Sequence, residues 1–158
     1  MGVGKSTTGR PLAEALDWPY VDSDGDIEML TGRSGRDIAK ELNVSALHQL
    51  EAALLLGALA RTEPHVITAA ASVVENPMVQ DVLPRNALVV RLVAPVEVTL
   101  ARQATGEHRR PMSAEALREL EARRDPLFEA LEDVKLDAGR DTEVLVREII
   151  EQCRAREM

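Results

Sequence analysis

The chain has 158 residues, 45% of them hydrophobic, which suits one domain that buries a core without disulfides or structural metals. Its 27 acidic residues outnumber the 19 basic ones, a balance that disfavours nucleic acid as a partner, and no apolar run is long enough to span a membrane. One cysteine and three scattered histidines disfavour a disulfide framework and a zinc site. With no signal-peptide pattern, we expect a single cytoplasmic domain over residues 1–158.

The first six residues, MGVGKS, match the second half of the phosphate-loop pattern G-x-x-x-x-G-K-[ST]. A glycine-rich turn that enters a helix directs backbone N–H groups and the positive helix end at one point, where a phosphate binds. Lys5 adds a mobile positive charge, and Ser6 adds a hydroxyl that ligates magnesium in such loops. An ordinary loop before a helix is the alternative, but helical spacing over residues 7–16 favours phosphate binding.

The first glycine of that pattern would lie ahead of residue 1. In an α/β protein the strand before a phosphate loop is central to a parallel sheet, so its absence leaves strand edges and apolar faces uncovered. We therefore hypothesise that Met1 is an internal methionine, preceded by a glycine and a strand of about five to eight residues.

Next along the chain, the pattern predicts a strand and then a helical segment. The apolar run WPYV at residues 18–21 ends in Asp22 and Asp24. A strand end beside a phosphate site is where acidic side chains are needed, although aspartates also favour ordinary turns. Helices are predicted over residues 26–30, 35–42 and 45–61, the last with Ser45 as its N-cap.

The second half of the chain alternates apolar runs with helical patterns. Residues 65–68 and 87–93 are β-branched apolar runs bounded by prolines, as buried parallel strands are. A further strand is expected over residues 134–136, helices over 95–105, 113–131 and 141–156, and a basic loop over 106–111. The alternation predicts an α/β fold with a parallel sheet flanked by helices.

With these segments in order, the chain resembles the shikimate kinase family, within the phosphate-loop proteins that are similar to nucleoside monophosphate kinases. The resemblance covers nearly the whole length and is carried by Gly4-Lys5-Ser6-Thr7, Gly9-Arg10-Pro11-Leu12-Ala13, Asp22-Ser23-Asp24 with Ile27-Glu28, Thr31-Gly32, Glu51, Ser72-Val73, Arg110-Pro111 and Arg124-Asp125-Pro126-Leu127. It implies a three-layer fold whose first central strand is missing from this chain, an acceptor-binding helical insertion over about 26–61, and a lid over about 106–113.

The resemblance also implies an activity, namely transfer of the ATP γ-phosphoryl group to a hydroxyl of shikimate in aromatic amino-acid biosynthesis, by a monomer. ATP would be bound by Gly2, Gly4, Lys5, Ser6, Thr7 and Arg110, and Mg²⁺ by Ser6 and Asp22. The catalytic residues would be Lys5, Asp24 as a base, and Arg110 on the lid. The acceptor would be bound by Asp24, His48, Ala70 and Arg124, and Arg124 would bind the carboxylate of the acceptor. Phosphoryl transfer needs such positioning and cations more than covalent groups.

Three departures from the family pattern all lie on the acceptor side. His48 stands where the family has an arginine that pairs with the acceptor carboxylate, and a neutral imidazole offers no bidentate fork. Residues 69–71 are alanines where the family has three glycines, which makes any positive φ there harder. Asn43-Val44 replaces a Gly-Glu pair. Two alternative functions therefore stay open. One is a kinase of the same fold that acts on another small polyol or sugar acid, and the other is nucleotide binding without turnover.

The singled-out residues also have plainer interpretations. Arg110 belongs to a basic loop of a kind that is common on protein surfaces. Arg124 has the spacing to pair with Glu121 along one helix. His48 is more readily understood as a half-buried helix residue than as a catalytic base.

Overall fold

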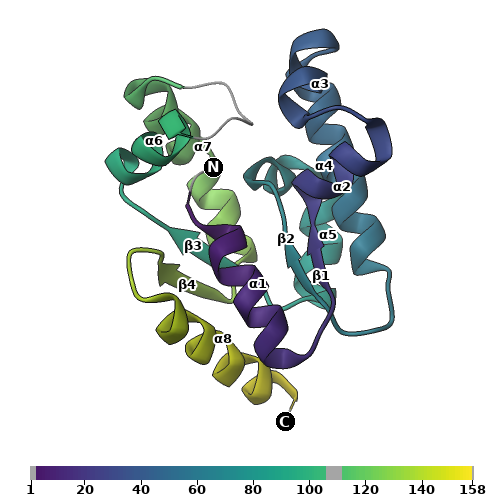
Figure 1. The fold of residues 1–158 in the computed structure, drawn as a ribbon, viewed down its shortest axis with the longest axis vertical. Coiled ribbons are helices and arrows are strands. Elements are labelled where there is room, and N and C mark those ends of the chain that lie inside the picture. Colours follow the sequence, from purple (N-terminus) through teal and green to yellow (C-terminus); the bar gives the residue numbers. More distant parts are fainter. Residues whose placement is uncertain (1–2, 106–111, 158) are drawn as a thin grey trace.

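The computed structural model describes residues 3–105 and 112–157 (Figure 1). The elements in chain order are α1 (Lys5–Leu16), β1 (Tyr20–Asp22), α2 (Ser23–Thr31), α3 (Gly35–Glu41), α4 (Val44–Leu59), β2 (Val66–Thr68), the 3₁₀ helix η1 (Ala71–Glu75), α5 (Pro77–Asn86), β3 (Val90–Val93), α6 (Val96–Thr105), α7 (Ala114–Leu131), β4 (Val134–Asp137) and α8 (Thr142–Glu157). The predicted α/β alternation is confirmed.

The described strands form two separate parallel pairs rather than one sheet. β1 pairs with β2, Tyr20 lying opposite Val66, and β3 pairs with β4, Val90 lying opposite Val134. Within residues 3–105 and 112–157 no strand joins β2 to β3. The parallel strands agree with the predicted fold, and the break between the pairs falls where a central strand would hydrogen-bond to both.

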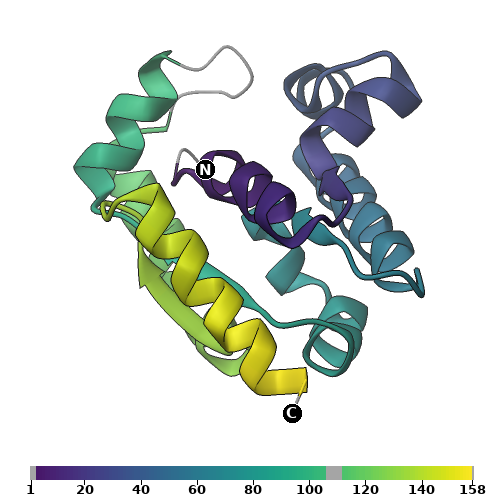
Figure 2. The same cartoon turned by 60° about the horizontal axis from the view of Figure 1, so that its bottom comes forward.

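Each strand pair is covered by helices on both faces, which gives three layers. Val66 of β2 and Val90 of β3 pack with Leu12 of α1 and with α8, whereas Ile67 and Val89, the neighbouring residues, pack with α4, η1, α5 and α7. This alternation is the period of two that a strand imposes on its side chains. Helices α1 and α8 contact each other on one side of the strands (Figure 2).

A cavity of about 490 Å³ lies between the two strand pairs. It is lined largely by apolar side chains, which come from β2, β3, α1, α4 and α7 and include Leu12, Leu55, Val66, Val90, Leu92, Phe128 and Leu131. The edges of β2 and β3 that face each other across it carry no strand partner among the described residues. The space therefore has the position and the lining expected for a buried strand.

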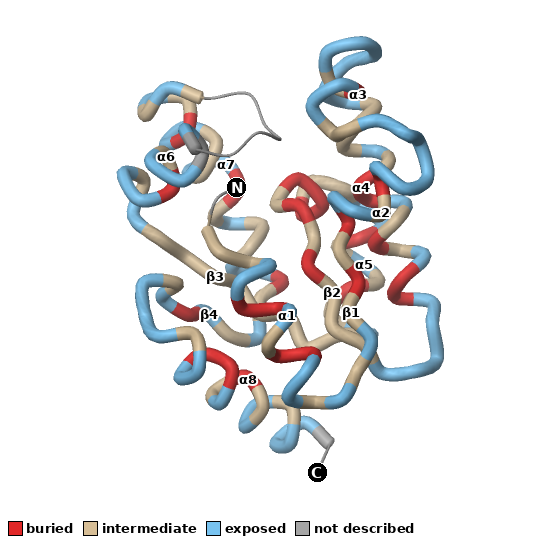
Figure 3. The backbone as a smooth tube through the Cα atoms, viewed as in Figure 1, coloured by how far each residue is buried: buried red, intermediate tan, exposed pale blue. Residues whose placement is uncertain are grey.

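The helical insertion predicted over about 26–61 corresponds to α2, α3 and α4, which form a lobe beside the first strand pair (Figure 1). Buried residues of α4 share a core cluster with Ile67 of β2, whereas most of α3 is exposed (Figure 3). Ser45 as the N-cap of α4 is wrong, because the Asn43 side chain accepts a hydrogen bond of 2.7 Å from the Ala46 N–H. The cap therefore lies two residues earlier than predicted.

Two elements after β2 were not predicted. Residues 71–86, which the sequence left unassigned, form η1 and α5. Two prolines obscure the helical pattern of α5 in the sequence. Pro77 occupies the first turn, where a missing N–H removes no helical hydrogen bond, and Pro84 lies in the last turn. The side chain of Asn76 caps this helix by accepting from the Met78 and Val79 N–H groups.

Candidate active site

The phosphate-loop residues lie where helix α1 begins. Gly4 is the N-cap of α1 with φ 97°, a left-handed conformation that favours glycine, and no side-chain hydrogen bond caps the helix there. Lys5, Ser6 and Thr7 form the first turn, whose backbone N–H groups have no partner within an α-helix. Phosphate binding at this helix end, where such N–H groups and the helix dipole favour an anion, stays a prediction.

A cavity of about 480 Å³ opens in front of this helix end. It brings together the predicted residues Gly4, Lys5, Ser6, Thr7, Asp22 and Asp24. Two further arginines line it that the sequence analysis did not single out, Arg102 of α6 and Arg140 in the loop after β4. Arg140 follows the carboxyl end of a predicted strand, and that position is a signal for ligand contact in α/β sheets.

The two aspartates mark the transition from β1 to α2. Asp22 ends the strand and caps the helix, its Oδ1 accepting from the Asp24 N–H at 3.3 Å. Its Oδ2 lies 3.4 Å from Arg10 Nη2 and accepts from the Tyr20 hydroxyl at 3.5 Å. Asp24 is exposed in the first turn of α2. The predicted placement of both carboxylates beside the phosphate loop is observed, within a helix start rather than a turn.

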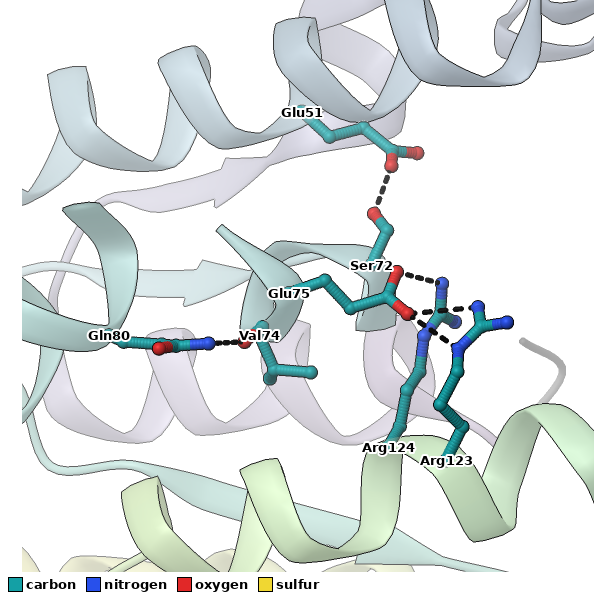
Figure 4. Close-up of polar contacts among 7 residues, drawn as sticks. All are labelled: Glu51, Ser72, Val74, Glu75, Gln80, Arg123 and Arg124. Carbon is teal, nitrogen blue, oxygen red and sulfur yellow. Dashed lines mark hydrogen bonds and ion pairs between the residues drawn. The ribbon is translucent and has the colours of Figure 1, made fainter. Parts of the chain in front are cut away.

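Arg124, which the resemblance assigns to acceptor binding, is buried. Its side chain is 9% exposed, and Nη2 donates to Glu75 Oε2 at 2.9 Å (Figure 4). Arg123 binds the other oxygen of Glu75 through Nε at 3.1 Å and Nη2 at 2.9 Å. These hydrogen bonds, from Arg124 above all, hold the pKa of Glu75 below its usual range. Arg124 therefore forms its ion pair with Glu75 rather than with the helical neighbour Glu121.

The remaining acceptor-side residues are spread over α4 and η1. His48 is half-buried on α4 and lines neither cavity described above. Ala70 is buried, lines the cavity between the strand pairs, and has φ −65° as the N-cap of η1. Because residues 69–71 have no positive φ, alanine fits the backbone conformation adopted there. Glu51, fully buried on α4, accepts a hydrogen bond from the Ser72 hydroxyl (Figure 4).

Some predicted residues cannot be placed. Gly2, Arg110 and the lid residues 106–111 lie outside the described residues. Thr8 and Thr68, which the prediction did not include, line both cavities together with Val3 and Lys5. The phosphate side and the cavity that Arg124 lines therefore share a wall.

An α/β domain whose first helix begins at a Gly-Lys-Ser-Thr loop, with strand-end carboxylates in the same cavity, is a phosphate-loop kinase by class. The family model for shikimate kinase matches residues 1–154. A shikimate kinase of Pseudomonas paraeruginosa is 33% identical over 98% of this chain and 92% of its own length, and one of Halorhodospira halophila is 33% identical over 99% and 90%. The chain belongs to the shikimate kinase family, whose members are ATP-dependent kinases.

Solved structures agree with this assignment. Shikimate kinase from Acinetobacter baumannii in complex with shikimate superposes with a TM-score of 0.90 at 26% identity, covering 100% of this chain and 90% of that one. Shikimate kinase from Bacteroides thetaiotaomicron, at 21% identity and a TM-score of 0.83, shares the fold. No helix within the described residues has the length and hydropathy to cross a membrane.

Proposed function

We propose that this chain transfers the γ-phosphoryl group of ATP to a hydroxyl of shikimate. The observation that carries the proposal is the shared cavity in which the uncapped start of α1, three cations and two carboxylates meet. In the transfer, the acceptor oxygen attacks the γ-phosphorus as the bond to the bridging oxygen of ADP breaks. Little covalent chemistry is required of the protein, so positioning and charge account for most of the catalysis.

The nucleotide side is assigned to the first helix. Backbone N–H groups from Gly4 to Thr7 would bind the phosphates, and Lys5 would neutralise the oxygens around the transferred phosphorus. Arg102 lies against the loop, since a Cβ on Gly4 would be 3.4 Å from Arg102 Nη1. Gly2 and Arg110 are assigned to ATP binding from the family pattern alone.

Magnesium fits the oxygen atoms present at this site. No group of three or more metal-ligating His, Cys, Asp or Glu residues occurs in the described part of the chain, which suits an ion that is held by one or two protein oxygens plus substrate phosphates. The Ser6 hydroxyl and the Asp22 carboxylate would hold it, and when bound it neutralises phosphate charge.

The acceptor side is assigned to Asp24, Arg124, His48 and Ala70. Asp24 would take the proton of the attacking hydroxyl, and Arg124 would bind the acceptor carboxylate. We further propose that the chain works in the cytoplasm as a monomer on small molecules, without a nucleic-acid or membrane partner. Another small polyol or sugar acid is the second candidate acceptor, which is permitted because His48 replaces the family's arginine and offers no bidentate fork to a carboxylate.

The test is ADP release from Mg-ATP with and without shikimate at neutral pH. Shikimate should raise the rate well above the idle ATPase, and Asp24→Asn should remove that stimulation, by about 10²- to 10⁴-fold for a general base, at nearly unchanged ATP affinity. Asp26→Asn, on the same helix but outside the cavity lining, is the control and should behave like wild type. Full stimulation by shikimate in Asp24→Asn would remove Asp24 from the mechanism.

A further inference from the structure

The contact between Glu75 and Arg124 joins two distant parts of the chain at a residue that is assigned to acceptor binding. Glu75 ends η1, 49 residues before Arg124 on α7. The two side chains are 27% and 9% exposed, so this ion pair is more shielded from water than the surface pairs, such as Asp81 with Arg85 at 64% and 74%. Shielding makes the pairing of a charge count for more than it does at the surface.

The backbone around Glu75 is held by core packing and by hydrogen bonds. Val73 and Val74 are buried in the core immediately before it, and the Val74 carbonyl accepts from the Gln80 side chain at 2.7 Å (Figure 4). The Asn76 N–H donates to the Val73 carbonyl at 3.1 Å, and the Asn76 side chain caps α5. The carboxylate is therefore presented to Arg124 by an ordered 3₁₀ turn.

Arg124 has donor capacity left beside this contact. Its Nε is buried and has no hydrogen-bond partner within the described residues. An acceptor carboxylate that binds through Nε either displaces Glu75 from Nη2 or lies beside its negative charge. Both routes weaken the binding of a carboxylate, because like charges at close range repel and Nη2 is already in use.

We propose that Glu75 is a specificity-determining residue that competes with the carboxylate of the acceptor for Arg124. The proposal rests on the function proposed above, in which Arg124 binds that carboxylate. Glu75 lowers the affinity for carboxylate-bearing acceptors and leaves an uncharged acceptor of the same shape unaffected. In the reaction Glu75 affects acceptor binding and not ATP binding, since its ion-pair contacts are with Arg123 and Arg124 and it is absent from the lining of the phosphate cavity.

The test compares KM and kcat for shikimate in wild type, Glu75→Gln and Glu75→Ala. Competition predicts that both variants lower KM for shikimate, on the order of tenfold for a charged hydrogen bond, with kcat and KM for ATP unchanged. Asp81→Asn removes an equal charge from an exposed position on α5 and should leave all constants at the wild-type values. The methyl ester of shikimate, which lacks the negative charge, should show no change between wild type and either Glu75 variant.

A positioning role for Glu75 gives the opposite result. If its carboxylate only holds Arg124 in place, Glu75→Ala raises KM for shikimate and Glu75→Gln stays close to wild type, and the proposal is overturned. Equal effects on shikimate and its methyl ester would overturn it as well, because the effect would then not depend on acceptor charge.

Calorimetric titration with shikimate separates this proposal from the proposed function. Tighter binding by Glu75→Gln without shikimate-stimulated ADP release in any variant would refute the kinase activity on shikimate and support the role of Glu75. Stimulated release with equal dissociation constants in wild type and variant would support the activity and overturn the role of Glu75. Binding by neither protein would overturn both.

Discussion

Helix α1 lies so close to the strands that position 9 has room for glycine only. A Cβ built on Gly9 would lie 2.6 Å from Thr68 Cγ2 and 3.0 Å from Tyr20 Cε2. Thr68 is buried, stiff at χ1, and joined through Oγ1 to the Tyr20 hydroxyl at 2.8 Å. Neither neighbour is the end of a flexible side chain, so Gly9→Ala has to move α1 away from β1 and β2.

The expected cost combines two opposing effects. Overpacking a core site destabilises by about 1–3 kcal/mol, and replacing a glycine inside a helix by alanine returns up to about 1 kcal/mol. Because a contact of 2.6 Å is too short for two carbon atoms, the overpacking cost falls in the upper part of that range, about 2–3 kcal/mol. Gly9→Ala should therefore lower the free energy of unfolding by about 1–2 kcal/mol, which is roughly 2–8 °C in thermal midpoint for a domain of this size. Urea unfolding followed by circular dichroism measures it.

Two variants isolate the clash. Gly57→Ala on α4, where an added Cβ meets nothing within 4 Å, should be neutral or stabilising, since it gains helix propensity alone. Thr68→Ser removes Cγ2 and keeps the hydroxyl, so it should recover part of the stability in the Gly9→Ala background. Wild-type stability in Gly9→Ala, or no rescue by Thr68→Ser, would refute the close approach of α1 to β2.

Two further predictions concern the Glu75 ion pair and the cavity between the strand pairs. Because the pKa of Glu75 is lowered in the folded state, first by the hydrogen bond from Arg124, its contribution to stability is present above its ordinary pKa and is lost as pH falls through the lowered one. Wild type should thus exceed Glu75→Gln in urea stability at pH 7 and lose that advantage in acid; a constant difference contradicts this. An apolar strand of about five to eight residues fused ahead of Met1 should raise the thermal midpoint by burying apolar surface between β2 and β3. The same extension with serines at its apolar positions is the control, and equal midpoints would show that the cavity does not take the strand.

Most elements were predictable because their signals are local. β-Branched runs bounded by prolines located β2 and β3, and the G-K-S-T start located α1, within a few residues of the observed bounds. The N-cap of α4 was misassigned because Asn43 and Ser45 are both good caps, and which one is used depends on where the chain leaves its extended conformation. Helix α5 was missed because prolines near its ends resemble breaks in a pattern.

In the candidate site, too, some residues could be predicted from local sequence and others could not. Gly4, Lys5, Ser6, Asp22 and Asp24 belong to one short stretch, so their meeting in a single cavity follows from a strand and a helix that are adjacent in sequence. Arg102 and Arg140 reach this cavity from α6 and from the loop after β4, and the pairing of Glu75 with Arg124 spans 49 residues. Such contacts depend on how the elements pack, which no local pattern encodes.

The phosphate side and the proposed acceptor side come from different elements, so acceptor choice can change separately from phosphate binding. Most of the phosphate side comes from residues 3–24, with Arg102 and Arg140 added from α6 and the loop after β4. The acceptor side proposed above is instead assembled from α4, η1 and α7, which carry His48, Glu75 and Arg124. A single carboxylate on η1 therefore alters what Arg124 can bind without touching α1. Because Glu75 also stabilises the fold through that pair, removing it should improve acceptor binding and weaken the domain together, a combination that neither a positioning residue nor a purely structural ion pair would give.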